Sequence, residues 1–533
     1  MSDKRVYLFD TTLRDGAQTQ GVDFSSADKT AIAEELDRLG IDYIEGGWPG
    51  ANPTDDAFFA KPPTLKGAKL TAFGMTRRAG RSTENDPGLN AILDVKTAAV
   101  CMVGKTWDFH VDVALNISND ENVAMIRDSV KMAAKKKDEV MFDAEHFFDG
   151  YKANPKFAME CLKAAYDAGA RWIVLCDNNG GTLPHEIEEI VTAVAKEIPG
   201  DHLGIHCHDD TGNAVAGSLA AVRAGVRQIQ GTLNGLGERC GNANLISIIP
   251  SLILKMGFET NVSADQLTHL SHISRMVDER LGRTSNQGAP YVGDRAFAHK
   301  GGLHVSAIEK DPQCYEHINP ETVGNVRHIV VSDQAGRSNI LARFREIGLE
   351  IDPKNPKISS LVDEVKEQEF AGYAYDGAEA SFELLARRAL GDVPDYFKLA
   401  SFRVIDERRW NAKGELITLS EATVRLETNH HQTMAVAEGN GPVNALDAAL
   451  RQVLTPVYPE LEDMQLIDYK VRILTPGEGT RAVTRVMIES ADGKGEHWST
   501  VGVSPNVIDA SYNALRDAIV FKLYKAGIEA RHQ

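Results

Sequence analysis

The sequence predicts an α/β protein whose N-terminal half is a (β/α)8 TIM barrel, and two observations support this fold class. Up to about residue 260, short runs rich in β-branched residues alternate with segments whose apolar residues follow helical spacing. Nearly every run ends in polar residues, and the C-terminal face of a barrel is where many strand ends meet. The repeat pattern by itself is also compatible with an open, doubly wound sheet. The predicted strands are Val6–Asp10, Tyr43–Gly46, Lys69–Gly74, Ala98–Val103, Glu139–Asp143, Trp172–Cys176, Leu203–His206 and Gln228–Thr232.

Helices are expected between these strands because the apolar residues there recur every three or four positions. In Ser25–Gly40 the apolar residues Ile32, Leu36 and Leu39 lie on one side of a helix, and Pro184–Ile198 follows the same spacing. One apolar face per helix is what a layer of helices around a central barrel requires.

Three regions of different pattern divide the chain. We expect a catalytic barrel over residues 1–270, and a helical linker region over residues 271–400 with polar turns around Gly282–Gly293 and Gly301–His304. Residues 401–533 alternate between strands and two helices, which predicts a C-terminal α+β domain.

The C-terminal region contains a weak internal repeat. His431–Thr433 followed by Pro442–Leu446 is similar to His497–Ser499 followed by Asn506–Ala510. Two similar units, each with strands and one helix, predict a small pseudo-symmetric domain, and a dimerisation module is its simplest interpretation.

Composition and charge restrict the function. The chain of 533 residues carries 58 Lys and Arg against 76 Asp and Glu, a formal charge of −18, and no segment is dominated by basic residues. We therefore expect no binding to nucleic acid or to anionic membranes. Met1–Arg5 leads directly into a strand-like run, and no apolar segment reaches the roughly 20 residues that cross a bilayer. A cytoplasmic location is expected.

A metal site is predicted by His206, His208 and Asp15. On an extended strand, residues two positions apart face the same side, so both imidazoles can reach one ion. Asp15 follows the first strand and, in a closed barrel, lies close to the seventh. This set suits Mg²⁺, Mn²⁺ or Zn²⁺ and leaves positions open for substrate. The alternatives are hydrogen-bonded core histidines and an aspartate that caps a turn.

Arg14 places a fixed cation beside the predicted metal site. A metal and a guanidinium together suit a 2-oxo acid, because they hold its carboxylate and stabilise negative charge that develops on the ketone oxygen. The alternative is an ordinary Arg–Asp surface pair. Glu145, just beyond the fifth strand, and His304, in a Gly-rich loop, are candidate acid–base groups, although each alone is more often structural.

Other cofactor signatures do not fit. The glycines in Asn234–Asn242 follow the eighth strand with the spacing GxGxxxG, which differs from the dinucleotide fingerprint GxGxxG. The sequence also has no GxxxxGK[ST] loop and no GxSxG elbow, so nucleoside triphosphate and serine hydrolase chemistry lose support.

With these residues in place, the chain resembles the 2-isopropylmalate/homocitrate/citramalate synthase family, the Claisen-condensing branch of the DRE-TIM metallolyases. The resemblance covers essentially the whole chain and includes a C-terminal regulatory domain similar to the LeuA dimerisation domain. It is carried by DTTLRDG at Asp10–Gly16, HCHDD at His206–Asp210, GTLNGLGERCGN at Gly231–Asn242, GGLH at Gly301–His304 with Tyr315, Glu316 and Pro320 beyond it, and Gly439–Val443 with Ala510 and Ser511.

Within the family, three strand-end segments look most like the longer bacterial citramalate synthases: Glu45–Pro53, Gly104–His110 and Cys176–Pro184. One departure is Asn178, which stands where many members have the threonine of Asp-Thr-Val-Gly. An asparagine amide also donates a hydrogen bond, so the resemblance implies that Asn178 contacts the substrate carboxylate.

The resemblance implies a condensation of acetyl-CoA with pyruvate that gives (R)-citramalate and CoA, in isoleucine biosynthesis. Asp15, His206 and His208 would hold the divalent ion and Arg14 would stabilise the developing alkoxide. Glu145 and His304 would act as base and acid, and the resemblance does not decide which residue has which role. Tyr315 would assist them in proton transfer. It also implies a homodimer with shared sites and feedback by isoleucine at the C-terminal domain.

Substrate choice is expected to depend on residues at the strand ends that surround the oxo acid. Met75, Met102, Asp143 and Asn178 are predicted to form this pocket, and their sizes favour a small acid. The alternatives within the family are 2-isopropylmalate synthase, which uses 2-oxoisovalerate in leucine biosynthesis, and homocitrate synthase. Outside the family, the appended C-terminal domain argues against a hydroxymethylglutaryl-CoA lyase. A non-catalytic amino-acid sensor would not need the intact set of candidate residues, which is Arg14, Asp15, Glu145, His206, His208 and His304.

Overall fold

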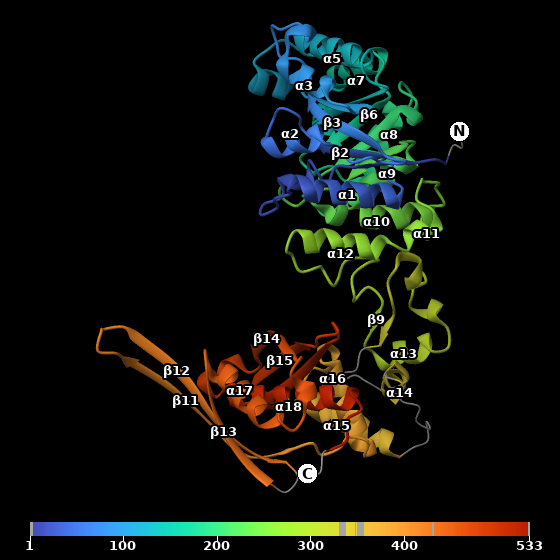
Figure 1. The fold of residues 1–533 in the computed structure, drawn as a ribbon. Helices are drawn as coiled ribbons and strands as arrows, with labels where there is room; N and C mark the ends of the chain where they lie inside the picture. The colour runs from blue at the N-terminus through green and yellow to red at the C-terminus, as the bar shows by residue number, and fades with distance from the viewer. Residues whose placement is uncertain (1–3, 330–336, 347, 349–355, 429–430, 531–533) are drawn as a thin grey trace. The chain divides into compact units, whose positions relative to one another are not determined.

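The computed structural model describes residues 4–530 apart from 330–336, 347, 349–355 and 429–430. The chain forms two compact units: Met1–Phe297 with Ile318–Arg327, and Ala298–His317 with His328–Gln533. Figure 1 shows both units along the chain.

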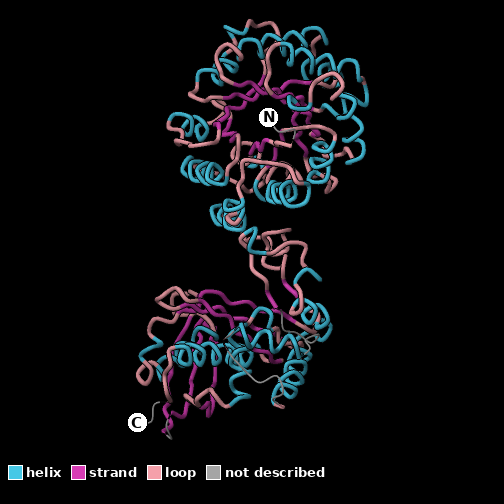
Figure 2. The backbone as a smooth tube through the Cα atoms, turned by 90° about the vertical axis from the view of Figure 1, so that its right-hand side faces the viewer, coloured by secondary structure: helices cyan, strands magenta, loops and turns pink. Residues whose placement is uncertain are grey.

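The first unit contains a closed barrel of parallel strands in sequence order, so the fold class is confirmed and the open-sheet alternative is wrong. Closure is made by β1, which pairs with β2 through Phe9 and Tyr43 and with β8 through Tyr7 and Gln228. Figure 2 shows the strands as a ring inside the helices. The strands are β1 (Tyr7–Asp10), β2 (Tyr43–Gly47), β3 (Lys69–Met75), β4 (Ala99–Lys105), β5 (Glu139–Glu145), β6 (Trp172–Asp177), β7 (Leu203–Cys207) and β8 (Gln228–Gly231).

The helices of this unit form where the sequence provides caps and an apolar face. In α1 the Ser25 side chain accepts a hydrogen bond from the backbone N–H of Asp28, and Gly40 ends the helix at φ 96°, a conformation that glycine adopts without strain. The main helices are α1 (Ser26–Leu39), α2 (Pro53–Ala60), α3 (Pro87–Asp94), α5 (Asn119–Ala133), α6 (Phe147–Ala153), α7 (Pro155–Asp167), α8 (Pro184–Val194), α9 (Ala214–Arg223), α10 (Leu245–Pro250) and α12 (Leu270–Arg280).

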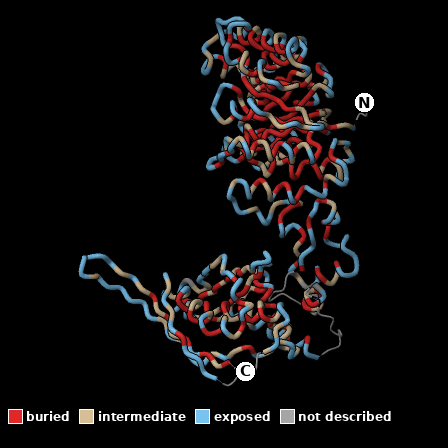
Figure 3. The backbone as a smooth tube through the Cα atoms, viewed as in Figure 1, coloured by how far each residue is buried: buried red, intermediate tan, exposed pale blue. Residues whose placement is uncertain are grey.

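Strand side chains point alternately into the barrel and toward the helices. Large side chains fill the interior, and the Trp172 Nε1–H donates to the Tyr43 hydroxyl at 3.1 Å. Because the interior is packed, as the buried strands in Figure 3 show, polar groups are left for the C-terminal strand ends. The buried interior cluster consists of Phe9, Tyr43, Phe73, Ala99, Cys101, Met141, Trp172, Val174 and Cys176.

The second unit contains two similar βββα halves, each a three-stranded antiparallel sheet followed by one helix. The central strands bury alternate residues against the helices, for example Val424 against α17 and Ile488 against α18. The first half is β11 (Lys398–Trp410), β12 (Leu416–Thr428), β13 (His431–Gly439) and α17 (Pro442–Leu454), and the second is β14 (Gln465–Ile473), β15 (Thr484–Ala491), β16 (His497–Ser504) and α18 (Val507–Lys525).

Helix α16, which precedes these halves, packs on the second one. The Ser381 hydroxyl on α16 donates to Asp517 of α18 at 3.0 Å and accepts from the backbone N–H of Val501 on β16 at 3.0 Å. Arg388 also pairs with Asp517, at 2.9 Å. Along the described residues, we find no helix with the length and apolar character needed to cross a membrane. The preceding helices are α13 (Gly302–Ile308), α14 (Arg337–Glu346), α15 (Lys357–Phe370) and α16 (Glu379–Leu390).

Candidate active site

Hydrogen bonds between neighbouring residues fix the conformation of the loop after β1. The Asp10 carboxylate accepts hydrogen bonds from the backbone N–H and the hydroxyl of Thr12 at 2.9 and 2.8 Å. The Thr12 hydroxyl in turn accepts from the backbone N–H of Leu233, in the loop after β8, at 2.8 Å. This turn places the next two polar residues, Arg14 and Asp15, at the mouth of the barrel.

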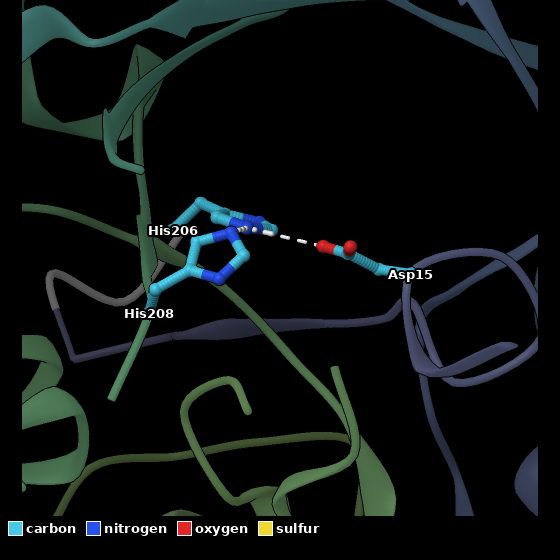
Figure 4. Close-up of side chains that lie close together, drawn as sticks. All are labelled: Asp15, His206 and His208. Carbon is cyan, nitrogen blue, oxygen red and sulfur yellow. Dashed lines mark hydrogen bonds and ion pairs between the residues drawn. The ribbon is translucent and has the colours of Figure 1, made fainter. Parts of the chain in front are cut away.

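The structure brings Asp15, His206 and His208 together (Figure 4). All three are at least nine-tenths buried. The His206 Nε2 atom lies 3.3 Å from Asp15 Oδ2 and 3.4 Å from His208 Nε2. Neighbouring ligands of an ion with bonds near 2.1 Å lie about 3.0–3.4 Å apart, so these donor atoms fit one ion without large movement.

A second layer of side chains orients His206. Its Nδ1–H donates to Gln230 Oε1 at 2.8 Å, and the Gln230 amide donates to Asp143 at 2.9 Å. With the proton on Nδ1, the Nε2 lone pair is directed at Asp15 and His208. Such outer hydrogen bonds fix the tautomer of metal-binding histidines. Sequence reasoning missed Gln230 because only the closed barrel places β8 beside β7.

The electrostatics also suit a cation. Burial opposes ionisation of Asp15, but the neighbouring Arg14 guanidinium lowers the pKa of Asp15 below the usual range. Burial and the neighbouring His206 lower the pKa of His208 to about 3, so this imidazole is neutral. Metal ligation requires an ionised carboxylate and a neutral imidazole, which are the forms these two side chains adopt.

Asn242 is a further site residue that the side-chain reasoning missed. Its amide donates to Asp15 Oδ2 at 2.8 Å, and its buried Oδ1 has no hydrogen-bond partner among the described residues. An unpaired buried oxygen beside an aspartate and two histidines is suited to a cation or a substrate hydroxyl. The signal was present in the sequence, because Asn242 ends the motif Gly231–Asn242.

Arg14 is held in one orientation. Its Nε–H donates to Glu45 at 2.7 Å, its Nη1 lies 3.4 Å from Asp15, and its guanidinium lies 3.9 Å from the centre of the Phe73 ring. Burial works against the charge, but Asp15 and Glu45 raise the pKa of Arg14, so it stays cationic. Glu45 itself has a pKa raised to about 7, chiefly by burial, and one of its carboxylate oxygens lies within 4.8 Å of Asp143 and Cys101.

The candidate acid–base and carboxylate-binding residues lie at the ends of β5 and β6. Glu145 pairs with Lys105 at 2.6 Å. The Asn178 Oδ1 accepts from the backbone N–H of His146 at 2.7 Å, which orients the amide N–H₂ of Asn178 as the remaining donor. Arg239 ties these loops together, since it donates to the Asn178 carbonyl at 2.6 Å.

The residues predicted to form the oxo-acid pocket lie in different surroundings. Met75 is 40% exposed at the end of β3, and Asp143 lies inside the barrel mouth, where it accepts from Gln230. Met102 corrects an expectation: it is buried in the layer between the strands and the helices, whereas its neighbour Cys101 faces the interior. The prediction of Met102 as a substrate contact was therefore wrong.

His304 and Tyr315 belong to the second unit, whereas the other candidate residues belong to the first. Their rings stack with centroids 3.9 Å apart and planes 21° apart. Both side chains are exposed, Tyr315 by 47%. The structure thus brings these two residues together as a pair.

Three family models match successive segments of the chain. Residues 5–277 match the family model described as HMGL-like, residues 291–371 match the homocitrate synthase post-HMGL domain-like model, and residues 376–523 match the LeuA allosteric (dimerisation) domain. Among solved structures, the HMG-CoA lyase of Bacillus subtilis is 22% identical and covers 53% of this chain and 95% of its own, with a TM-score of 0.46.

Curated relatives match over nearly the full length. The (R)-citramalate synthases of Aquifex aeolicus and Geobacter sulfurreducens are each 52% identical, over 98% of this chain and 98% of their own. A probable 2-isopropylmalate synthase of Methanopyrus kandleri is 32% identical over 96% of this chain and 97% of its own. The chain therefore belongs to the HMGL-like family and, within it, to the (R)-citramalate synthases.

Proposed function

We propose that this protein condenses acetyl-CoA with pyruvate to give (R)-citramalate and CoA. The observation that carries the proposal is the 52% identity to (R)-citramalate synthases over 98% of both chains, against 32% to a probable 2-isopropylmalate synthase. The barrel mouth supports it, because it combines an ionised carboxylate, two histidines and a fixed guanidinium in one buried site.

In the proposed reaction, pyruvate binds at the barrel mouth. A divalent ion held by Asp15, His206 and His208 would supply Lewis acidity toward the ketone when bound. Arg14 faces the same point and stabilises the negative charge that develops on the ketone oxygen. The free N–H₂ of Asn178 donates to the carboxylate.

The acyl donor must lose a proton from its methyl group before the new C–C bond forms. Glu145 lies at the barrel mouth and His304 stacks on Tyr315 in the second unit. We propose that these residues share the roles of base and acid. The carbanion attacks the ketone carbon, the resulting alkoxide takes up a proton, and water then cleaves the thioester to release CoA and the diacid.

Regulation is proposed for the C-terminal domain, on the basis of the match to the LeuA allosteric (dimerisation) domain. A homodimer would be assembled there, and isoleucine would bind as the feedback inhibitor of a citramalate-forming step.

The test is thiol release from acetyl-CoA with a divalent ion and, in separate reactions, pyruvate, 2-oxobutyrate, 2-oxoisovalerate and 2-oxoglutarate. We expect strong preference for pyruvate, with citramalate as the product. Preference for 2-oxoisovalerate or 2-oxoglutarate would instead favour 2-isopropylmalate or homocitrate synthesis. No release with any acid would contradict a condensing enzyme.

A further inference from the structure

One histidine with a strained backbone follows the candidate acid–base residue Glu145. Strand β5 ends at Glu145 and helix α6 begins at Phe147, so His146 alone makes the turn between them. The backbone of His146 is left-handed, with φ 56° and ψ 35°. This conformation strains any residue that has a side chain, and such strain is retained most often where it serves the function of a site.

The peptide group between Glu145 and His146 is held on both sides. Its carbonyl accepts hydrogen bonds from the backbone N–H and the hydroxyl of Thr106 at 3.2 and 2.8 Å. Its N–H points the opposite way, as in any trans peptide, and donates to Asn178 Oδ1 at 2.7 Å. Because a backbone N–H can only donate, this contact decides that the oxygen of the Asn178 amide faces it. The N–H₂ end is then left as a donor for a carboxylate.

The direction of this N–H depends on the backbone conformation of His146. Helix α6 is fixed against the loop after β4, since a Cβ atom added at Gly150 would lie 2.4 Å from the carbonyl oxygen of Thr106. With the helix fixed, a change of φ at His146 must rotate the preceding peptide group and turn its N–H away from Asn178. The left-handed turn and the orientation of the Asn178 amide are therefore coupled.

Contacts of the imidazole hold His146 in its strained conformation. Its ring centroid lies 4.2 Å from that of His110 and 6.0 Å from that of Trp107, both in the segment after β4. Its Nδ1 lies 3.4 Å from Asp149 Oδ2 on α6, and the same oxygen accepts from the Asn179 amide at 2.9 Å. These contacts join the loops after β4, β5 and β6 and offset the cost of the left-handed backbone.

We infer that His146 is a positioning residue for the oxo acid: its left-handed backbone, held by the imidazole contacts, directs the N–H₂ of Asn178 at the substrate carboxylate. The inference rests on the proposed function and adds what orients that contact. An asparagine needs such a partner, because its amide has a donor at one end and an acceptor at the other, and the acceptor would repel a carboxylate. In this role the imidazole holds the backbone and transfers no proton.

The first test compares side chains that differ in their tolerance of a left-handed backbone. We expect His146→Val to raise the KM for pyruvate about tenfold, as for a lost hydrogen bond to a charged group, and to leave the KM for acetyl-CoA within about twofold of wild type. His146→Asn should keep both KM values and kcat within about twofold, because asparagine adopts this conformation readily. His146→Ala, a milder change, replaces the valine variant if that protein does not fold.

A matched control places the same strain away from the site. Asn116 is exposed, has φ 53° and donates its backbone N–H to Asp112 at 3.0 Å. Asn116→Val should lower the melting temperature and leave the KM for pyruvate unchanged. An equal rise of this KM in Asn116→Val would assign the effect to lost stability and contradict the inference. A kcat of His146→Asn that falls about 100-fold or more would contradict it too, because the imidazole would then take part in the chemistry.

The coupling between His146 and Asn178 is the second test. Asn178→Ala removes the amide and should raise the KM for pyruvate by itself. Adding His146→Val to Asn178→Ala should raise this KM no further, because there is no amide left to orient. Effects that multiply in the double variant would show that the two residues act independently, which overturns the inference and leaves the proposed condensation intact.

A crystal structure of His146→Val separates the inference from the proposed function. If another oxo acid is the substrate, the same KM comparison is made with that acid, since all of them carry the carboxylate. If no oxo acid supports thiol release in the wild type, the proposed condensation fails and the structure decides the inference. Loss of the hydrogen bond between Asn178 Oδ1 and the backbone N–H of residue 146 supports it, whereas a retained bond overturns it.

Discussion

At the scale of single residues, the protonation and orientation of each site group are set by its neighbours. Asp15 is ionised because the charge of Arg14 outweighs the effect of burial on its pKa. His206 directs Nε2 at Asp15 because Gln230 accepts from Nδ1. Arg14 keeps one pose because Glu45 and Phe73 hold its guanidinium from two sides. The site is thus organised in advance for a cation and a small anion.

The Gln230 contact gives a prediction about metal binding. Gln230→Leu removes the acceptor of the His206 Nδ1–H, so we expect the affinity for Mn²⁺ or Zn²⁺ to fall about 10- to 100-fold, the usual cost of losing such an outer contact. The measurement is calorimetric titration of the metal-free protein. Gln228→Leu is the matched control on the same strand: Gln228 is also fully buried, and its Oε1 has no hydrogen-bond partner among the described residues. Equal affinities in the two variants would show that Gln230 does not orient His206.

At the scale of elements, the loops after β6, β7 and β8 are tied together by one side chain. Arg239 donates to both carboxylate oxygens of Asp210 at 2.7 and 2.8 Å and to the carbonyl of Asn178 at 2.6 Å. Its own backbone lies in the left-handed region at φ 55°, which is costly for a residue with a side chain. Strain that is retained beside a site indicates that the position of this guanidinium matters for function.

Arg239→Ala is therefore predicted to change catalysis more than stability. The side chain is 45% exposed, so its loss should cost only about 0–1 kcal/mol of unfolding free energy. Asn178 would lose its support, and we expect kcat/KM for pyruvate to fall about tenfold or more. Arg223→Ala, which removes an exposed pair with Glu188 at 3.2 Å, should leave kcat/KM unchanged. A large drop in thermal stability without a kinetic change would assign Arg239 a purely structural role.

At the scale of the whole molecule, the candidate residues are divided between two units. The candidate metal ligands and Glu145 lie in the barrel unit, whereas His304 and Tyr315 lie in the other. Helix α16 packs on the second C-terminal half, where Ser381 donates a hydrogen bond to Asp517. This helix lies within residues 271–400, which were expected to form a linker region. Removal of the C-terminal domain near residue 400 would therefore leave apolar residues of α16 uncovered.

This division predicts the behaviour of a chain that ends at Arg327, the last residue of the barrel unit. We expect it to bind the divalent ion with the affinity of the full chain, because all three donor residues lie in the barrel. Thiol release should fall by about two orders of magnitude or more, since α13 with His304 would lose the partner helix α14. Isoleucine should have no effect on the remaining activity. Loss of metal affinity in a folded fragment would contradict a self-sufficient metal site.

Much of the site could be predicted from the sequence because its parts are local. Asp10–Gly16 forms its own turn, and His206 and His208 share a face because they are two residues apart on a strand end. Eight alternating runs and their polar ends predicted the barrel. The sequence itself thus determined the element types and which residues form the candidate donor set beside Arg14.

Only the tertiary structure decided the contacts between strands and the facing of buried residues. Gln230 reaches His206, and Asn242 reaches Asp15, because closure brings the last strand and its loop beside distant parts of the chain. Met102 was misplaced because a parallel strand is buried on both faces, so a continuous apolar run such as Ala99–Val103 carries no alternation that distinguishes the inside from the outside. The local sequence pattern determines which residues form a strand. Tertiary packing determines whether each of their side chains faces the barrel interior or the surrounding helices.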